Sequence, residues 1–163
     1  MRHSFNFTLL CIFLTSACAA RVAEDPSLLQ LATCQQSWLD WKQDPAKLET
    51  FRAQFNSHYT EDGNDGSFVP KAPTTLHGQK VSRVFPQSVG MGVGYSVLLD
   101  AGFDATRREL VKQIGKPLEH CAKAEGLRMC EHLIGPKKTI ILTEATVGKK
   151  PQTLVGCYYY YEK

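Results

Sequence analysis

The fold of this chain is decided by residues 118–161, which read LEHCAKAEGLRMCEHLIGPKKTIILTEATVGKKPQTLVGCYYYY. Turn-forming residues interrupt this stretch at 125–126, 135–136 and 148–151. Short connections of this kind are typical of antiparallel sheets, in which each strand returns beside the one before it. The pattern predicts an antiparallel meander with strands near 118–122, 127–134, 139–147 and 152–161.

Two cysteines of this stretch, Cys121 and Cys130, face each other when a two-residue turn is placed at 125–126. Counted outward from the turn they form a non-hydrogen-bonded pair, whose Cα atoms lie about 4.5 Å apart, within the reach of a disulfide. Their pairing leaves Cys34 with Cys157. Loop entropy gives roughly 2.7 kcal/mol for the short bridge and roughly 4.9 kcal/mol for the long one. The alternative is a zinc site, which the absence of a C-x₂₋₄-C spacing disfavours.

A helix is predicted immediately before the meander. Thr106 with Glu109 forms a capping box at its start, although Asp104 is an alternative cap. Gly115 is suited to end the helix, since glycine readily adopts the left-handed conformation found there.

Two strands are predicted before that helix, one over 76–85, which Gly78 breaks, and one over 89–99. In the second, large apolar side chains alternate with glycine or serine, as in Gly94 and Ser96. One face of this strand is therefore nearly bare, and a bare face lets another backbone approach closely.

The N-terminal part favours a helical hairpin over 26–56. Each of its two helices opens with an Asp–Pro pair, Asp25-Pro26 and Asp44-Pro45, which combines a capping side chain with a proline at the first helical position. The expected fold class is α+β: a helical hairpin, then a disulfide-stapled antiparallel sheet in the order ββαββββ. Residues 21–163 are expected to form a single domain, with a helical part at 21–56, a polar loop at 57–73 and a sheet part at 74–163.

Residues 1–20 have the features of an export signal: a basic start, an apolar run over 5–14, and the small residues Ala17 and Ala19 before a cleavage site. The run is too short to span a bilayer. Cys18 offers an alternative, because the residues before it resemble a bacterial lipobox and would make it a lipidated N-terminus. We expect a periplasmic protein, either soluble or tethered through Cys18.

The composition is that of a globular protein, with 43% hydrophobic and 21% charged residues. The formal net charge of +3 is too small to indicate binding of nucleic acid or of anionic lipid. Nothing in the sequence after the signal suggests a membrane-spanning segment.

Residues suited to catalysis or metal binding are sparse. No HExxH motif or i, i+4 pair occurs among the histidines after the signal, His58, His77, His120 and His132. The hairpin register places His120 opposite Glu131, away from His132. Residues 61–66 match only a fragment of a calcium loop. We expect no catalytic residue, no metal and no cofactor, and therefore no enzyme.

The last strand contains four consecutive tyrosines, Tyr158, Tyr159, Tyr160 and Tyr161. Successive side chains of a strand point to opposite faces, so Tyr159 and Tyr161 share a face with Cys157 while Tyr158 and Tyr160 share the other. One pair is expected in the core. The other would be available to a protein partner, since tyrosine is enriched at interfaces; the alternative is an ordinary aromatic sheet partly covered by loops.

The layout of residues 103–163, a helix, the turn Gly115-Lys116-Pro117 and a cysteine-containing meander, resembles small periplasmic domains. These are the β-lactamase inhibitor proteins and other inhibitor- or immunity-type proteins, and the BamE-like domains of outer-membrane assembly. The resemblance and the lack of catalytic groups imply an exported protein-binding module, foremost an immunity or inhibitor protein that blocks a toxin or hydrolase. The alternatives are a structural envelope lipoprotein and, third, a small hydrolase.

Overall fold

Most of the described chain belongs to a large, mostly antiparallel sheet. The computed structural model describes residues 23–24, 30–37, 43–63, 66–86, 88–89, 92–124, 126–147 and 150–160. The strands are β1 (Ala23–Glu24), β2 (Tyr59–Glu61), β3 (Phe68–Pro70), β4 (Thr74–Leu76), β5 (Gln79–Phe85), β6 (Ser88–Val89), β7 (Gly92–Leu99), β8 (Glu119–Ala124), β9 (Leu127–Gly135), β10 (Lys138–Val147) and β11 (Lys150–Tyr160). The labelled helices are α3 (Pro45–His58) and α4 (Phe103–Ile114).

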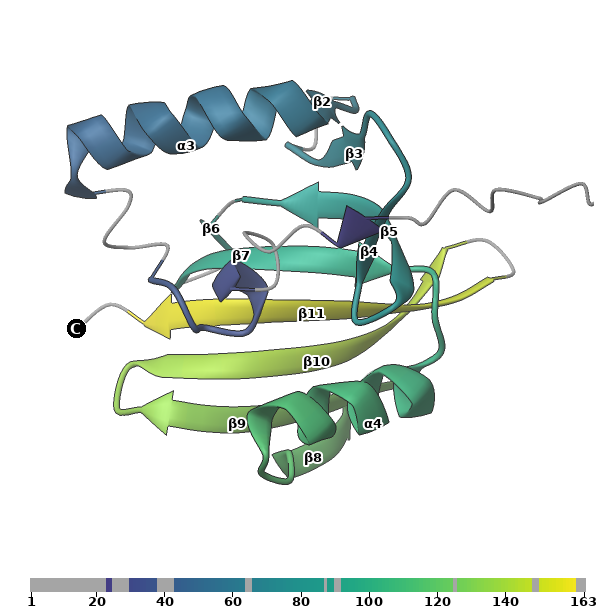
Figure 1. The fold of residues 1–163 in the computed structure, drawn as a ribbon. Helices are drawn as coiled ribbons and strands as arrows, with labels where there is room; N and C mark the ends of the chain where they lie inside the picture. The colour runs from purple at the N-terminus through teal and green to yellow at the C-terminus, as the bar shows by residue number, and fades with distance from the viewer. Residues whose placement is uncertain are drawn as a thin grey trace, which may run out of the picture.

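The strands follow the order β1-β4-β5-β7-β11-β10-β9-β8. The meander predicted from the sequence is present, because β8, β9, β10 and β11 pair antiparallel in succession. The last of them, β11, returns to pair with β7 and so lies in the middle of the sheet (Figure 1). An α+β fold with a mostly antiparallel sheet and two disulfides is therefore confirmed.

The core lies between one face of this sheet and the helices (Figure 1). Phe51 and Phe55 on α3 stack with their ring centroids 5.3 Å apart, and Phe51 meets the ring of Tyr95 on β7 edge-on at 6.4 Å. Phe103 and Leu110 on α4 are buried in the same cluster. Both helices thus contribute apolar side chains to one common core.

Of the two helix N-caps predicted from the sequence, one is confirmed and one is wrong. Asp44 caps α3 as predicted, accepting hydrogen bonds from the backbone N–H groups of Ala46 and Lys47 at 3.0 and 3.2 Å. The capping box at α4 is wrong: the N-cap is Gly102, four residues before Thr106, and it makes no side-chain bond. Thr106 is buried instead and donates to the amide oxygen of Gln79 at 2.8 Å.

Three further expectations differ from the structure. The segment 57–73, expected as a polar loop, contains the end of α3 and the paired strands β2 and β3. The strand expected over 76–85 is a hairpin of β4 and β5, because His77 and Gly78 turn the chain with φ of +54° and +70°. The strand expected over 89–99 is described as β6 and β7.

Several expectations concern other parts of the chain. The signal at 1–20, Cys18, the start of the helical hairpin at Asp25-Pro26 and Tyr161 lie outside the described residues. Within the described ranges, no helix is long and apolar enough to cross a membrane.

Both predicted disulfides are present. Cys121 and Cys130 are bonded across the β8–β9 hairpin with Cα atoms 4.0 Å apart, and Cys34 is bonded to Cys157 with Cα atoms 5.1 Å apart. Next to the turn the register is the predicted one, with Ala122 opposite Met129. On the other side of Cys121, away from the turn, the register differs from the predicted one.

The register shift corrects the placement of His120. A bulge lies between Glu119 and Ala122, so that Glu119 is the residue opposite Glu131. His120 takes a left-handed backbone conformation with φ of +48°, as the extra residue of a bulge can.

The two bridges differ in access, which leads to a first prediction. Cys121 is exposed, whereas Cys34 and Cys157 are 5% and 0% exposed. Reduction requires a thiolate to reach a sulfur atom, so the Cys121–Cys130 bridge should open first. Titration with dithiothreitol, alkylation and peptide mass spectrometry should find Cys121 and Cys130 labelled at lower reductant concentration than the other pair; the opposite order would contradict the different access.

Candidate functional site

The tyrosines of β11 divide between the two faces of the sheet as predicted. Tyr159 belongs to the core cluster with Cys157, and its hydroxyl donates to the carbonyl oxygen of Gln36 at 3.4 Å. Tyr158 is outside that cluster and yet only 7% exposed, whereas Tyr160 is 44% exposed. Of the described interface candidates, Tyr160 is therefore the accessible one.

Tyr158 is buried because its ring lies on the bare face of the sheet. A Cβ atom built on Gly94 would come within 2.6 Å of the Tyr158 ring, and one on Gly156 within 2.8 Å. Burial raises the pKa of the Tyr158 phenol, while a side-chain hydrogen bond with Ser96 lowers it. The bare face noticed in the sequence thus accommodates an aromatic ring of the neighbouring strand.

The exposed large apolar side chains are concentrated at one end of the sheet. Among the described residues they are Leu127, Leu133, Ile134 and Tyr160, at 39%, 54%, 40% and 44% exposure. Leu133 and Ile134 precede the β9–β10 turn, and the backbone N–H of Tyr160 donates to the carbonyl of Lys137 in that turn at 3.0 Å. We call Leu133, Ile134 and Tyr160 the end patch; Leu127 lies at the opposite end of β9.

The patch is held on rigid elements. Leu133 and Tyr158 both lie opposite Thr139 of β10, which places Leu133 on the face that also carries Tyr160. Burial raises the pKa of Tyr160, and the nearby carboxylate of Glu131 raises it further. The patch therefore combines apolar area with a neutral phenol hydroxyl, a combination that suits protein contacts.

A cavity of about 330 Å³ opens next to the patch. It lies between the 33–35 turn, the C-terminal end of α4 and strand β9, and Leu133 and Ile134 line it as well. His132 lines it too and is 8% exposed. The buried Nδ1 atom of His132 has no hydrogen-bond partner among the described residues.

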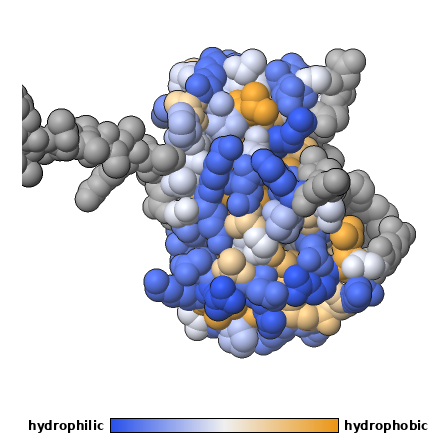
Figure 2. Space-filling view, turned by 90° about the vertical axis from the view of Figure 1, so that its right-hand side faces the viewer, coloured by the Kyte–Doolittle hydropathy of each residue, from blue (hydrophilic) through white to orange (hydrophobic). Residues whose placement is uncertain are grey.

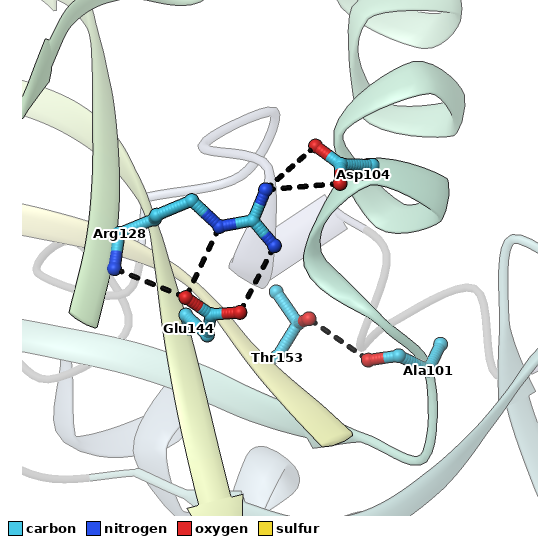
Figure 3. Close-up of polar contacts among 5 residues, drawn as sticks. All are labelled: Ala101, Asp104, Arg128, Glu144 and Thr153. Atoms are coloured by element: carbon cyan, nitrogen blue, oxygen red, sulfur yellow. Dashed lines mark hydrogen bonds and ion pairs between the residues drawn. The ribbon is translucent and has the colours of Figure 1, made fainter. Parts of the chain in front are cut away.

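The opposite end of the sheet carries a polar cluster (Figure 3). Arg128 forms bidentate contacts with Glu144, from Nε at 3.1 Å and from Nη2 at 2.9 Å, and its Nη1 reaches both oxygens of Asp104 at 2.9 and 3.0 Å. The guanidinium also lies 4.6 Å from the centre of the Phe103 ring. Hydrogen bonds from Arg128 hold the pKa of Glu144 below its usual value.

This cluster fastens α4 to the sheet. Asp104 is on α4, Arg128 on β9 and Glu144 on β10. Thr153 of β11 adds a bond to the carbonyl of Ala101 at 2.8 Å. The side of the molecule at the right of Figure 1 is predominantly hydrophilic, with small separate hydrophobic areas (Figure 2).

Groups suited to metal binding do not assemble in the described ranges. These residues contain no group of three or more His, Cys, Asp or Glu side chains that could hold a metal ion. In the fragment of a calcium loop, Asp62 is paired with Arg83 at 2.7 Å. The four described cysteines are bound in disulfides.

Comparisons of the chain with protein-family models, with curated proteins and with solved structures find no match. The assignment of a site therefore depends on the geometry alone.

Sequence reasoning identified Tyr160 but missed the other two residues of the end patch, Leu133 and Ile134, and the cavity. One signal was available: Leu133 and Ile134 are consecutive apolar residues just before the turn at Gly135. Since neighbouring residues of a regular strand point to opposite faces, such a pair cannot lie wholly in the core, and at least one of the two is expected on the surface.

Proposed function

We propose that this chain is an exported, non-enzymatic protein-binding module, in particular a periplasmic immunity or inhibitor protein that blocks a toxin or a hydrolase. The observation that carries the proposal is the end patch: three large apolar side chains exposed at the same end of the sheet, on strands that two disulfides hold in place. Exposed apolar groups that cluster on a rigid surface mark protein contacts.

The surroundings of the patch support a protein partner. Lys137 lies in the β9–β10 turn and Lys138 begins β10, shortly after Leu133 and Ile134, and Lys116 follows α4 at the same end. A partner that offers an apolar anchor surrounded by acidic side chains would match this combination, because complementary charge speeds association and orients the partner. A pre-ordered surface also loses little conformational entropy on binding.

The proposed compartment follows from the cysteine chemistry. Disulfides persist in oxidising compartments, and the buried Cys34–Cys157 bridge would be out of place in a reducing cytosol. The signal-like residues 1–20 supply the route, and Cys18 the lipid anchor if the module is tethered. The proposal also includes the N-terminal helical hairpin, with α3 as its second helix. It rests in part on the resemblance of the layout of residues 103–163 to small periplasmic inhibitor proteins.

The test combines capture with inhibition. The purified, disulfide-bonded protein is immobilised, exposed to secreted and periplasmic proteins of the source organism, and the retained protein is identified by mass spectrometry. We expect the purified partner to lose its toxic or hydrolytic activity when this protein is added. Replacing Leu133 by arginine should weaken that inhibition by about thirtyfold, as loss of a central interface residue does.

Leu127→Arg is the matched control, because it changes the same residue type on the same strand at the far end from the patch. It should inhibit as well as the wild type. Equal inhibition by both variants would exclude the end patch as the binding surface. A retained protein whose activity is unaffected would exclude the inhibitor function, and turnover of a substrate by the chain itself would exclude a non-enzymatic role.

A further inference from the structure

We propose that the cavity beside the end patch binds a small amphiphilic carboxylate, with its apolar tail inside and its carboxylate at Lys116. The cavity measures about 330 Å³, which is within the range of small-ligand sites. It is a separate proposal from protein docking, although Leu133 and Ile134 border both surfaces.

The charge of the lining selects an anion. Among the described residues, Lys116 is the one Lys or Arg that lines the cavity, and no Asp or Glu lines it. The side chains of Gln35 and Gln113 add amide donors. A carboxylate accepts charge-assisted hydrogen bonds from such a set, whereas an ammonium group would meet no carboxylate there.

The rest of the lining selects an apolar tail. Ile114, from the end of α4, and Leu133 and Ile134, from β9, contribute aliphatic walls, and the last two are 54% and 40% exposed. Removing aliphatic surface from water is favourable in proportion to the area buried. A ligand with a short hydrocarbon chain would gain this contact in addition to the contact of its head group.

His132 gives independent support for a bound ligand. Its buried Nδ1 has no hydrogen bond among the described residues, and buried polar atoms in native proteins are almost always bonded. A ligand oxygen entering the cavity can supply the missing partner to this ring. Two further histidines, His77 in the β4–β5 turn and His120 in β8, do not line the cavity.

The probe is octanoate, titrated into the purified disulfide-bonded protein by isothermal calorimetry. We expect saturable binding with one site. Octylamine, with the same tail and a positive head, and acetate, with the same head and no tail, should bind at least about tenfold more weakly. Equal binding of octylamine would overturn the role of charge, and equal binding of acetate would overturn the role of the tail.

Two substitutions of nearly unchanged size locate the site. Lys116→Gln removes the cation and Gln113→Glu adds a carboxylate, and each should weaken octanoate binding by roughly tenfold or more. Lys112→Gln is the matched control, because Lys112 is an exposed lysine on α4 that does not line the cavity. Wild-type affinity in both cavity variants, or an equal loss in the control, would overturn the assignment.

His132→Phe separates ligand binding from structure. A residue with only a structural role should lower the melting temperature when it is replaced. Here the replacement removes an unpaired buried polar atom, so the free protein should melt no lower than the wild type while octanoate affinity falls. Affinity unchanged at an intact fold would overturn the role of His132.

Discussion

Replacing Cys34 and Cys157 together by alanine should lower the free energy of unfolding by about 5 kcal/mol. The bridge closes a loop with a sequence separation of 123, and the entropy that such a link removes from the unfolded chain corresponds to about 4.9 kcal/mol. Domains are commonly stable by only about 5–15 kcal/mol, so much of this variant could be unfolded at 37 °C. Urea denaturation followed by circular dichroism measures the difference.

The second bridge is the internal comparison. Cys121 and Cys130 are separated by 9 positions, and the same entropy argument gives a loss of about 2.7 kcal/mol for their replacement by alanine. A larger loss from the short bridge than from the long one would contradict the view that loop length dominates here.

Tyr158→Ala should cost about 3 kcal/mol, or roughly 10 °C in melting temperature. The ring is 7% exposed and lies against Gly94 and Gly156. Because these glycines have no side chains, nothing else fills the space when the ring is removed. Removing the ring uncovers a strip of backbone and ends the bond with Ser96. Differential scanning calorimetry of the oxidised protein provides the measurement.

Two comparisons make this prediction specific. Tyr160→Ala, one residue along and 44% exposed, should change the stability by less than about 1 kcal/mol. Gly94→Ala should destabilise the wild type, because its Cβ would lie 2.6 Å from the Tyr158 ring, and should cost less when Tyr158 is already alanine. Additive losses would show that the ring does not occupy this position.

The parts of the fold that the sequence predicts well are those governed by local geometry. A turn at Gly126, which has φ of +86°, together with the two-residue period of a strand, was sufficient to pair Cys121 with Cys130. The Asp44 cap of α3 and the left-handed Gly115 at the end of α4 are likewise decided by a few neighbouring residues. These elements needed no information about the rest of the chain.

The parts that were missed depend on distant contacts. β3 pairs with β2 and, through Phe68 opposite Val84, with β5, and the polar sequence around it gives no sign of either pairing. Thr106 resembles a cap but bonds Gln79, which is 27 residues away. The bulge at His120 depends on how β8 meets β9 beyond the disulfide.

The candidate site was foreseen only in part. The sequence directed attention to the tyrosines, and Tyr160 does lie in the end patch, but Tyr158 and Tyr159 are buried. The cavity joins residues from the 33–35 turn, α4 and β9, three segments that are far apart in the chain. No spacing rule applied to a single segment can find such a site.

The nested order of the cysteines has a consequence for biosynthesis. Cys34 leaves the ribosome or translocon long before Cys157, and both Cys121 and Cys130 appear in between. An oxidase that joins thiols in order of emergence would link Cys34 to Cys121 and leave Cys130 for Cys157. Unless the β8–β9 hairpin closes first, a chain oxidised in this order would need a disulfide isomerase to reach the native pairs.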